Sequence, residues 1–199
     1  MKNALILASG SQTRAQLMTN AGLDFEVVKP RVDEDAIKTS LILENAAPRD
    51  IADTLAEFKA RRVGQKHPNA LVLGCDQVAE LDQQLINKPE SPDQAKDQLT
   101  QMSGKTHRLL SAAVIYHGYE PIWRHVGVVR LTMRKLSPAY IDAYVERNWE
   151  SIRYSVGSYK LEEEGVRLFS QVAGDYFNVL GLPLTELLSY LITRGDLET

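Results

Sequence analysis

The sequence is poor in the residues that build disulfides, metal-thiolate sites and membrane spans. It holds one cysteine, Cys75, among 199 residues, so neither an intrachain disulfide nor a zinc site made of cysteines can form. No stretch approaches the roughly 18 consecutive apolar residues of a transmembrane helix. The apolar run at 4–8 is also too short for the apolar core of a signal peptide. We therefore expect a cytoplasmic protein that makes no contact with a membrane.

The sequence also has no excess of basic over acidic residues. The chain has 23 Lys and Arg against 26 Asp and Glu, with a formal net charge of -3. This balance argues against a dedicated DNA or RNA surface, although it leaves room for a local basic pocket that holds a small anion. Hydrophobic residues make up 44% and charged residues 25%, which is ordinary for a globular protein. We expect one domain over 1–199.

Strands and helices alternate along most of the chain, and this pattern predicts the α/β class. Apolar runs end at Ser/Gly turns or at Pro, and helical stretches begin at Ser or Pro. Residues 33–35 are expected in a loop, and the region 149–181 is expected to mix short strands with turns. The expected strands are 4–8, 25–28, 70–75, 107–117 and 122–133, and the expected helices are 14–22, 48–66, 92–102, 137–148 and 183–195.

The first strand is followed by a turn with features of an anion site. Ser9, Gly10 and Ser11 precede a helix that contains Arg14 in its first turn. Free N–H groups at a helix start attract anions, and a guanidinium can add a bidentate contact to a phosphate. The alternative is an ordinary helix cap with a solvated arginine, and the motif alone does not decide between the two.

Two groups of carboxylates are candidates for metal or water binding. Asp76 follows an apolar strand, and ligands of α/β sheets bind beyond the carboxyl ends of strands. It could hold a divalent ion or orient a water, although Asp is also frequent in strand-end turns. The triplet 33–35 offers oxygen ligands for Mg²⁺ or Mn²⁺, but by itself such a triplet is more typical of a solvated surface.

Several single residues carry weaker signals. Lys59, Lys88 and Lys160 are isolated lysines, of which Lys88 stands out because Pro89 fixes the turn after it. His107 begins an expected strand and could donate to a phosphate or a base, although a lone histidine is more often structural. Cys75 is expected to be a small buried side chain rather than a nucleophile.

The order of these motifs along the chain resembles the Maf family of nucleoside triphosphate pyrophosphatases, from about Leu5 to Leu191. The matching segments are Ser9-Gly10-Ser11 with Arg14, Asp33-Glu34, Lys59, 74–78, Lys88-Pro89, Ser103-Gly104 with His107, 157–162 and 174–184.

The resemblance implies a mixed central sheet flanked by helices, with two lobes around a deep cleft, and often a homodimer. It implies a divalent cation, Mg²⁺ or Mn²⁺, and hydrolysis of a nucleoside triphosphate between its α and β phosphates. Asp76 takes the place of the proton acceptor, and Glu34, with Asp33 in support, takes part in metal binding together with Asp76. The roles of Asp76 and Glu34 as catalytic base and metal ligand could be exchanged, because sequence does not give geometry. The residues placed against the substrate are Ser9, Ser11, Arg14, Lys59, Lys88, His107, Lys160 and Glu162.

This chain departs from the family pattern in two places. Gln12 and Thr13 stand where family members commonly have Pro and a further Arg, so one phosphate-binding charge is missing. The segments 75–77 and 157–162 look more like the branch that acts on 7-methyl-GTP than the branch that acts on dTTP and UTP. Glu162 then stands at a base-reading position. An ionised carboxylate accepts hydrogen bonds but donates none, and this favours a guanine-type base.

Two other functions stay open at this point. The missing arginine is compatible with a nucleotide-binding regulator without catalysis, for example one that acts on cell division through a partner. An RNA-contacting module could use the aromatic residues Trp123, Tyr140 and Trp149, but the net acidity of the chain and the lack of a stacking motif argue against it.

Overall fold

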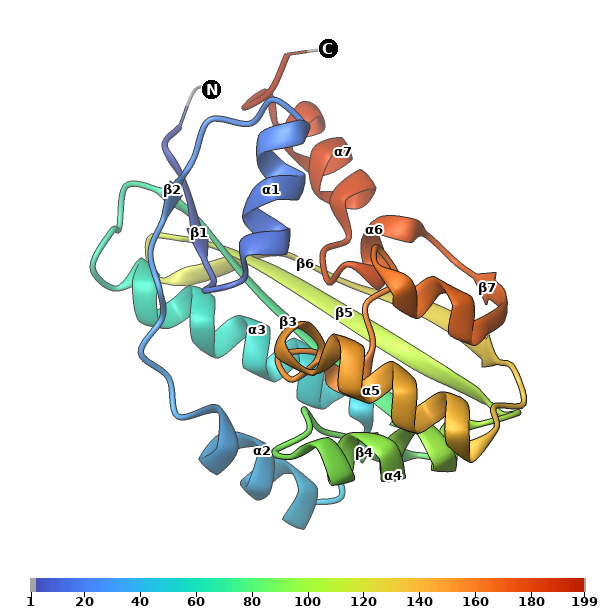
Figure 1. Ribbon diagram of the computed structural model, residues 1–199. Helices are drawn as coiled ribbons and strands as arrows, with labels where there is room; N and C mark the ends of the chain where they lie inside the picture. Colours follow the sequence, from blue (N-terminus) through green and yellow to red (C-terminus); the bar gives the residue numbers. More distant parts are fainter. Residues whose placement is uncertain (1–2, 199) are drawn as a thin grey trace.

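The computed structural model, which describes residues 3–198, has the α/β architecture that the sequence predicts (Figure 1). One mixed sheet has the strand order β2-β1-β3-β5-β6-β7, and β4 pairs with β3 beside this path. β1 is parallel to both β2 and β3, whereas the other pairs are antiparallel. The strands are β1 (Leu5–Ala8), β2 (Glu26–Val27), β3 (Leu71–Leu81), β4 (Gln84–Ile86), β5 (Thr106–His117), β6 (Glu120–Met133) and β7 (Phe169–Ala173).

Three of the predicted helices begin at serine caps. The hydroxyls of Ser11, Ser91 and Ser137 each accept a hydrogen bond from a backbone N–H in the first turn. The last helix ends at Gly195, whose φ of 78° is typical of a C-terminal cap. The helices are α1 (Gln12–Asn20), α2 (Glu34–Leu43), α3 (Pro48–Gly64), α4 (Pro92–Met102), α5 (Pro138–Ile152), α6 (Tyr176–Val179) and α7 (Leu184–Arg194). Within residues 3–198, none is both long and apolar enough to cross a bilayer.

The helices divide one face of the sheet into two parts. α3 packs through Leu55 against the face that includes Val72. Side chains alternate between faces along a strand, so Leu73 and Leu81 of β3 share the opposite face. Leu73 packs in a core cluster with α1 and α7, and Leu81 packs in a separate cluster with α4 and α5. These two helical groups form the two lobes, which lie at opposite ends of the sheet in Figure 1.

A gap in strand pairing opens beside β3. β1 pairs with β3 as far as Gly74, and β4 begins to pair with it at Ala79. Between these points, residues 75–78 have β5 as their partner on one side and neither β1 nor β4 on the other. Because a strand without a neighbour exposes its main-chain groups, the backbone N–H and C=O groups of residues 75–78 on this side are not used in strand pairing.

Two details differ from the sequence prediction. The strand expected to end at Asp76 continues to Leu81, so Asp76 lies inside β3, just beyond the stretch that pairs with β1. The triplet 33–35 is not a loop but the start of α2, where the Asp33 carboxylate caps the helix by accepting from the N–H of Ala36 at 3.0 Å. Acidic residues in a first turn favour a helix start, which explains the difference.

Candidate active site

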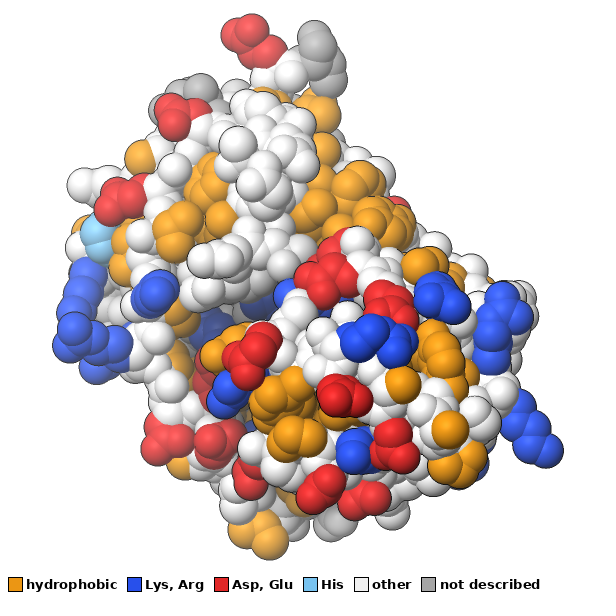
Figure 2. Space-filling model, viewed as in Figure 1, with side chains coloured by type: hydrophobic (Ala, Val, Ile, Leu, Met, Phe, Trp, Pro, Cys, Tyr) orange, Lys and Arg blue, Asp and Glu red, His pale blue; other side chains and the backbone are white. Residues whose placement is uncertain are grey.

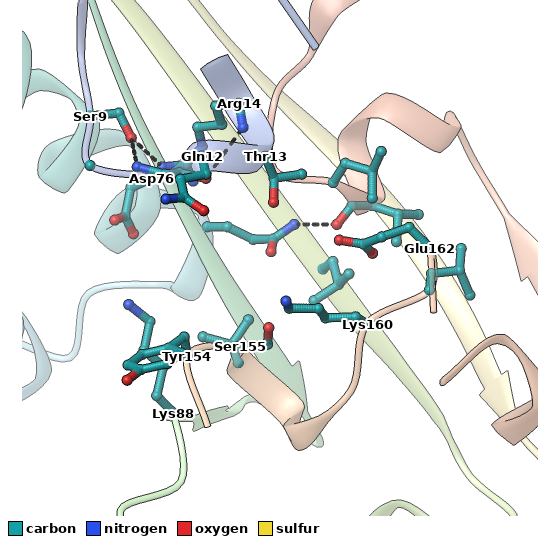
Figure 3. A pocket seen from close by; sticks show the side chains of 18 of the residues that line it. Ser9, Gln12, Thr13, Arg14, Asp76, Lys88, Tyr154, Ser155, Lys160 and Glu162 are labelled. Carbon is teal, nitrogen blue, oxygen red and sulfur yellow. Dashed lines mark hydrogen bonds between the residues drawn. The ribbon is translucent and has the colours of Figure 1, made fainter. Parts of the chain in front are cut away.

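A cleft of ≈ 810 Å³ lies at the gap beside β3, between the two helical groups. Its lining includes every residue that the sequence analysis places in the site except Asp33 and His107 (Figure 3). The Ser/Gly turn with Arg14 and the carboxylate of Asp76 therefore share one crevice, as binding to a single polyphosphate requires. The predicted residues in the lining are Ser9, Ser11, Arg14, Glu34, Lys59, Asp76, Lys88, Lys160 and Glu162.

The Ser/Gly turn presents the N-terminus of α1 to the cleft. Ser11 caps the helix, since its hydroxyl accepts from the N–H of Arg14 at 3.3 Å. The Ser9 hydroxyl accepts from the N–H of Ser11 at 3.2 Å and from the Arg14 guanidinium at 3.1 Å. The hydroxyls thus fix the turn, while the positive end of the helix dipole faces the cavity and favours an anion there.

Arg14 is buried and holds three segments of the chain together. Its Nε donates to the backbone oxygen of Gly181 at 2.7 Å, and its Nη1 donates to the Ser9 hydroxyl and to the backbone oxygen of Cys75 at 3.2 Å. Gly181 has φ of 91°, and a side chain there would place its first carbon 3.2 Å from Arg14 Nη2. Arg14 therefore braces the wall of the cleft, in addition to the charge it brings to the site.

Lys59 lies between two carboxylates. Its ammonium is 2.7 Å from Oδ1 of Asp76 and 3.0 Å from Oε2 of Glu34. Lys59 comes from α3, Asp76 from β3 and Glu34 from the first turn of α2, so three elements meet at one buried cation. Because an unpaired buried ammonium is costly, the two carboxylates stabilise Lys59, and Lys59 fixes their positions.

These residues fit a divalent cation that arrives with a phosphate ligand. Within the part of the chain that the structure describes, no three His, Cys, Asp or Glu side chains are grouped closely enough to hold a metal ion alone. Mg²⁺ usually binds through one or two carboxylates together with substrate phosphates and water. Asp76 and Glu34 supply such a pair of carboxylates at the cleft.

The opposite wall of the cleft comes from the segment that follows α5. In Figure 3, Lys160 and Glu162 lie across the cavity from Ser9 and Asp76, while Tyr154 lies near Lys88. Lys160 pairs with Glu163 at 3.1 Å. The cleft thus has a cationic and hydroxyl-rich end beside α1 and a separate end with an exposed carboxylate, which suits a ligand with a polyphosphate at one end and a base at the other.

Sequence reasoning missed Lys29, which also lines the cleft. Its aliphatic stem lies beside Gly10, since a carbon added at Gly10 would sit 3.9 Å from Lys29 Cγ. A signal was present, because Lys29 follows closely after the expected strand 25–28. The carboxyl ends of parallel strands meet at one edge of a sheet, and β2, β1 and β3 are parallel neighbours.

Two predicted site residues lie outside the cleft lining: Asp33, which caps α2, and His107. His107 is 1% exposed, packs behind Tyr159 and shares a 2.7 Å hydrogen bond with the Tyr159 hydroxyl. Tyr159 lines the cleft and His107 does not, so direct contact with substrate does not fit this position. His107 lies where β5 begins, and its ring packs against Tyr159 and Phe169. Burial lowers its pKa from 6.5 to about 4.

We expect His107 to make stability pH-dependent. The unfolded chain binds a proton on this ring below about pH 6.5, whereas the folded chain does so only near pH 4. The unfolded state is therefore favoured as pH falls through this window, by up to about 3 kcal/mol at 1.36 kcal/mol per pKa unit. Urea unfolding of wild type and His107→Gln at pH 7 and pH 4.5 measures this, and the variant should lose less stability between the two. Equal losses would contradict the assignment.

Comparison with known proteins matches this chain over nearly its whole length. A family model described as "Maf-like protein" matches residues 4–194. The chain is 60% identical over 195 residues to a protein of Ruegeria pomeroyi named nucleoside triphosphate pyrophosphatase, with 98% of both chains covered. It is 57% identical over 197 residues to a protein of the same name from Roseobacter denitrificans, covering 99% of both. It is also 43% identical over 198 residues to a 7-methyl-GTP pyrophosphatase of Mesorhizobium japonicum, covering 100% of both.

Proposed function

The chain belongs to the Maf family, and we propose that it hydrolyses a nucleoside triphosphate to the monophosphate and pyrophosphate in the cleft beside β3. The observation that carries the proposal is the meeting of Asp76, Lys59 and the N-terminal turn of α1 in one cavity. This cavity combines a carboxylate for the water with positive groups for the phosphates. The names of relatives at 57% and 60% identity agree with this activity.

Each group has a chemical task in this reaction. Lys59 holds Oδ1 of Asp76, and the other carboxylate oxygen is then available to accept the proton of the attacking water. Arg14, Lys88 and the N–H groups of α1 face the phosphates and favour the charge that develops as pyrophosphate leaves. Asp76 and Glu34 would hold a Mg²⁺ or Mn²⁺ ion together with the phosphates, and the ion would supply further charge neutralisation.

Lys29 supplies the charge that Thr13 does not. Both residues line the cleft, and the described residues contain no carboxylate within 4.0 Å of the Lys29 ammonium. We expect Lys29→Gln to raise the KM for the triphosphate about five- to tenfold, since about 1.4 kcal/mol of binding is tenfold in affinity. Adding Thr13→Arg in the same protein should restore most of the loss.

The steady-state kinetics of pyrophosphate release measure the effect of these substitutions. Lys38→Gln is the matched control, because Lys38 is on α2 and outside the cleft lining. An unchanged KM in Lys29→Gln, or a failure of Thr13→Arg to recover any affinity, would remove Lys29 from phosphate binding.

The substrate is proposed to carry a guanine-type base, and 7-methyl-GTP is the first candidate. Glu162 is exposed at the end of the cleft away from the α1 turn, where a carboxylate accepts hydrogen bonds from a guanine edge. A methylated, cationic guanine gains further from this negative charge. The relative named for this substrate, at 43% identity, agrees with the proposal.

A pyrophosphate-release screen tests both the activity and the substrate. The assay compares 7-methyl-GTP, GTP, UTP and dTTP, each with Mg²⁺ and with Mn²⁺. Release from any of them supports the activity, and a clear preference for UTP and dTTP would defeat the guanine assignment. Tight nucleotide binding without pyrophosphate release would select a non-catalytic regulator instead. The homodimer and the cytoplasmic location stay predictions.

A further inference from the structure

A second hollow, of ≈ 390 Å³, lies behind the phosphate end of the cleft. It is formed by the segment that follows β2 and by the C-terminal end of α3 with the turn after it. At about 30 Å³ per water molecule, it has room for on the order of ten waters. Its lining consists of Val28, Lys29, Arg31, Arg62, Val63, Lys66 and His67.

The charge of this hollow is of one sign. Four of its seven lining residues are Lys or Arg, and none is acidic. The described ion pairs include none of these four cations. Figure 2 shows Lys and Arg side chains gathered at the left edge of the molecule, over the end of α3 in Figure 1. In a chain of net charge -3, such a concentration of unpaired positive charge attracts an anion.

The helix dipole explains only part of this arrangement. Basic residues at the C-terminal end of a helix are favourable in any case, and this accounts for Arg62 on α3. It does not account for Lys29 and Arg31, which come from a different segment and face the same hollow. Cations that converge from two segments on one cavity repel each other when no anion is present, so the arrangement favours a ligand.

The hollow is connected to the cleft through one residue. Lys29 lines both cavities, so one side chain is shared by the phosphate end of the cleft and the second group of cations. An anion that leaves the cleft on this side meets Lys29 first and then Arg31, Arg62 and Lys66.

We propose that this hollow is a second anion site that binds inorganic pyrophosphate. The ligand is a compact polyanion, because four of the seven lining side chains carry a positive charge and none carries a negative one. That pyrophosphate is the natural occupant rests on the proposed function, since the cleft would release it next to Lys29. The binding itself does not depend on that reaction.

Isothermal titration of inorganic pyrophosphate into the full chain tests the proposal. A saturating, non-hydrolysable α,β-methylene triphosphate first occupies the cleft, so that further binding reports on the hollow. The informative variant is Arg62→Gln and its matched control is Arg61→Gln. The two positions are neighbours on α3 and lose the same charge, but Arg61 stacks on Phe58 at 4.5 Å and is absent from the hollow.

We expect wild type and Arg61→Gln to bind pyrophosphate with the same Kd within twofold, and Arg62→Gln to bind about five- to tenfold more weakly. Both arginines are exposed, so circular dichroism should show both variants folded. No pyrophosphate binding in wild type beside the analogue, or equal weakening in both variants, would overturn the proposal. The result is separate from the release assay: a chain that hydrolyses no nucleotide can still bind pyrophosphate here, and an active one can fail to bind it.

Discussion

Asp76→Asn should lower the turnover number for pyrophosphate release by about 100-fold or more. Asn keeps the shape of the side chain but cannot accept the proton of the attacking water, and general-base catalysis contributes on the order of 10²–10⁴-fold. The substitution also removes one of the two negative charges beside the buried Lys59, whose ammonium lies 2.7 Å from Asp76 Oδ1. Glu34 still pairs with Lys59 at 3.0 Å, so we expect a stability loss of about 2 kcal/mol, below the range for a fully broken buried pair.

A control on the same strand separates lost chemistry from lost stability. Glu80 is another buried carboxylate of β3, paired with Arg108 at 2.6 Å and outside the cleft lining. Glu80→Gln should therefore lose similar stability but retain turnover. Both variants are compared by urea unfolding and by kcat under conditions where each is folded. Turnover near wild type in Asp76→Asn, or an equal loss in Glu80→Gln, would remove Asp76 from the reaction.

Gly74→Ala should destabilise the protein by about 3 kcal/mol or more. A methyl group at Gly74 would lie 2.2 Å from the backbone oxygen of Ala56 and 2.5 Å from the backbone nitrogen of Ala60. Both are main-chain atoms of α3, so relief requires the helix to move away from the sheet, and overpacking of this kind costs about 1–3 kcal/mol or more. At roughly 2–4 °C per kcal/mol for a chain of this size, Tm should fall by about 10 °C.

The same displacement should reduce turnover, because it carries Lys59 on α3 away from Asp76 on β3. Gly64→Ala is the matched control on the same helix. A methyl group there meets its nearest neighbour, Tyr116 Cβ, at an ordinary 3.5 Å, and Ala is favoured over Gly in a helix by up to about 1 kcal/mol. Gly64→Ala should be neutral or stabilising with full activity. A Gly74→Ala protein with wild-type Tm would show that close approach of α3 is not required.

The regular elements were predictable from sequence because their signals are local. Pro and Ser at helix starts mark α3, α4 and α5, and long apolar runs mark β3, β5 and β6. α2 was missed because its apolar stripe is short: Ile37 and Leu41 pack against the core, but no residue of the helix is fully buried. Its start was marked only by the cap at Asp33 with acidic residues after it.

The composition of the cleft was predicted better than the contacts within it. The motifs identified most of the residues that the structure brings together, but pairing depends on tertiary geometry that spacing does not encode. Nothing in the sequence indicates that the Arg14 guanidinium bonds to Gly181 and Cys75, or that Lys59 lies between two carboxylates. Likewise, the polarity of His107 suggests the cleft, whereas its position at the start of β5 turns it into the core.

The interrupted pairing of β3 makes the main chain itself part of the cleft wall. On this open edge, the backbone oxygen of Cys75 accepts a hydrogen bond from Arg14. The backbone N–H and C=O of Gln77, two residues further along the strand, point to the same side. Peptide groups are present whatever side chain occupies a position. A ligand held partly by backbone groups keeps those contacts when the surrounding side chains are exchanged. Substitutions at positions such as Glu162 can therefore accommodate new substrates while the backbone contacts stay the same.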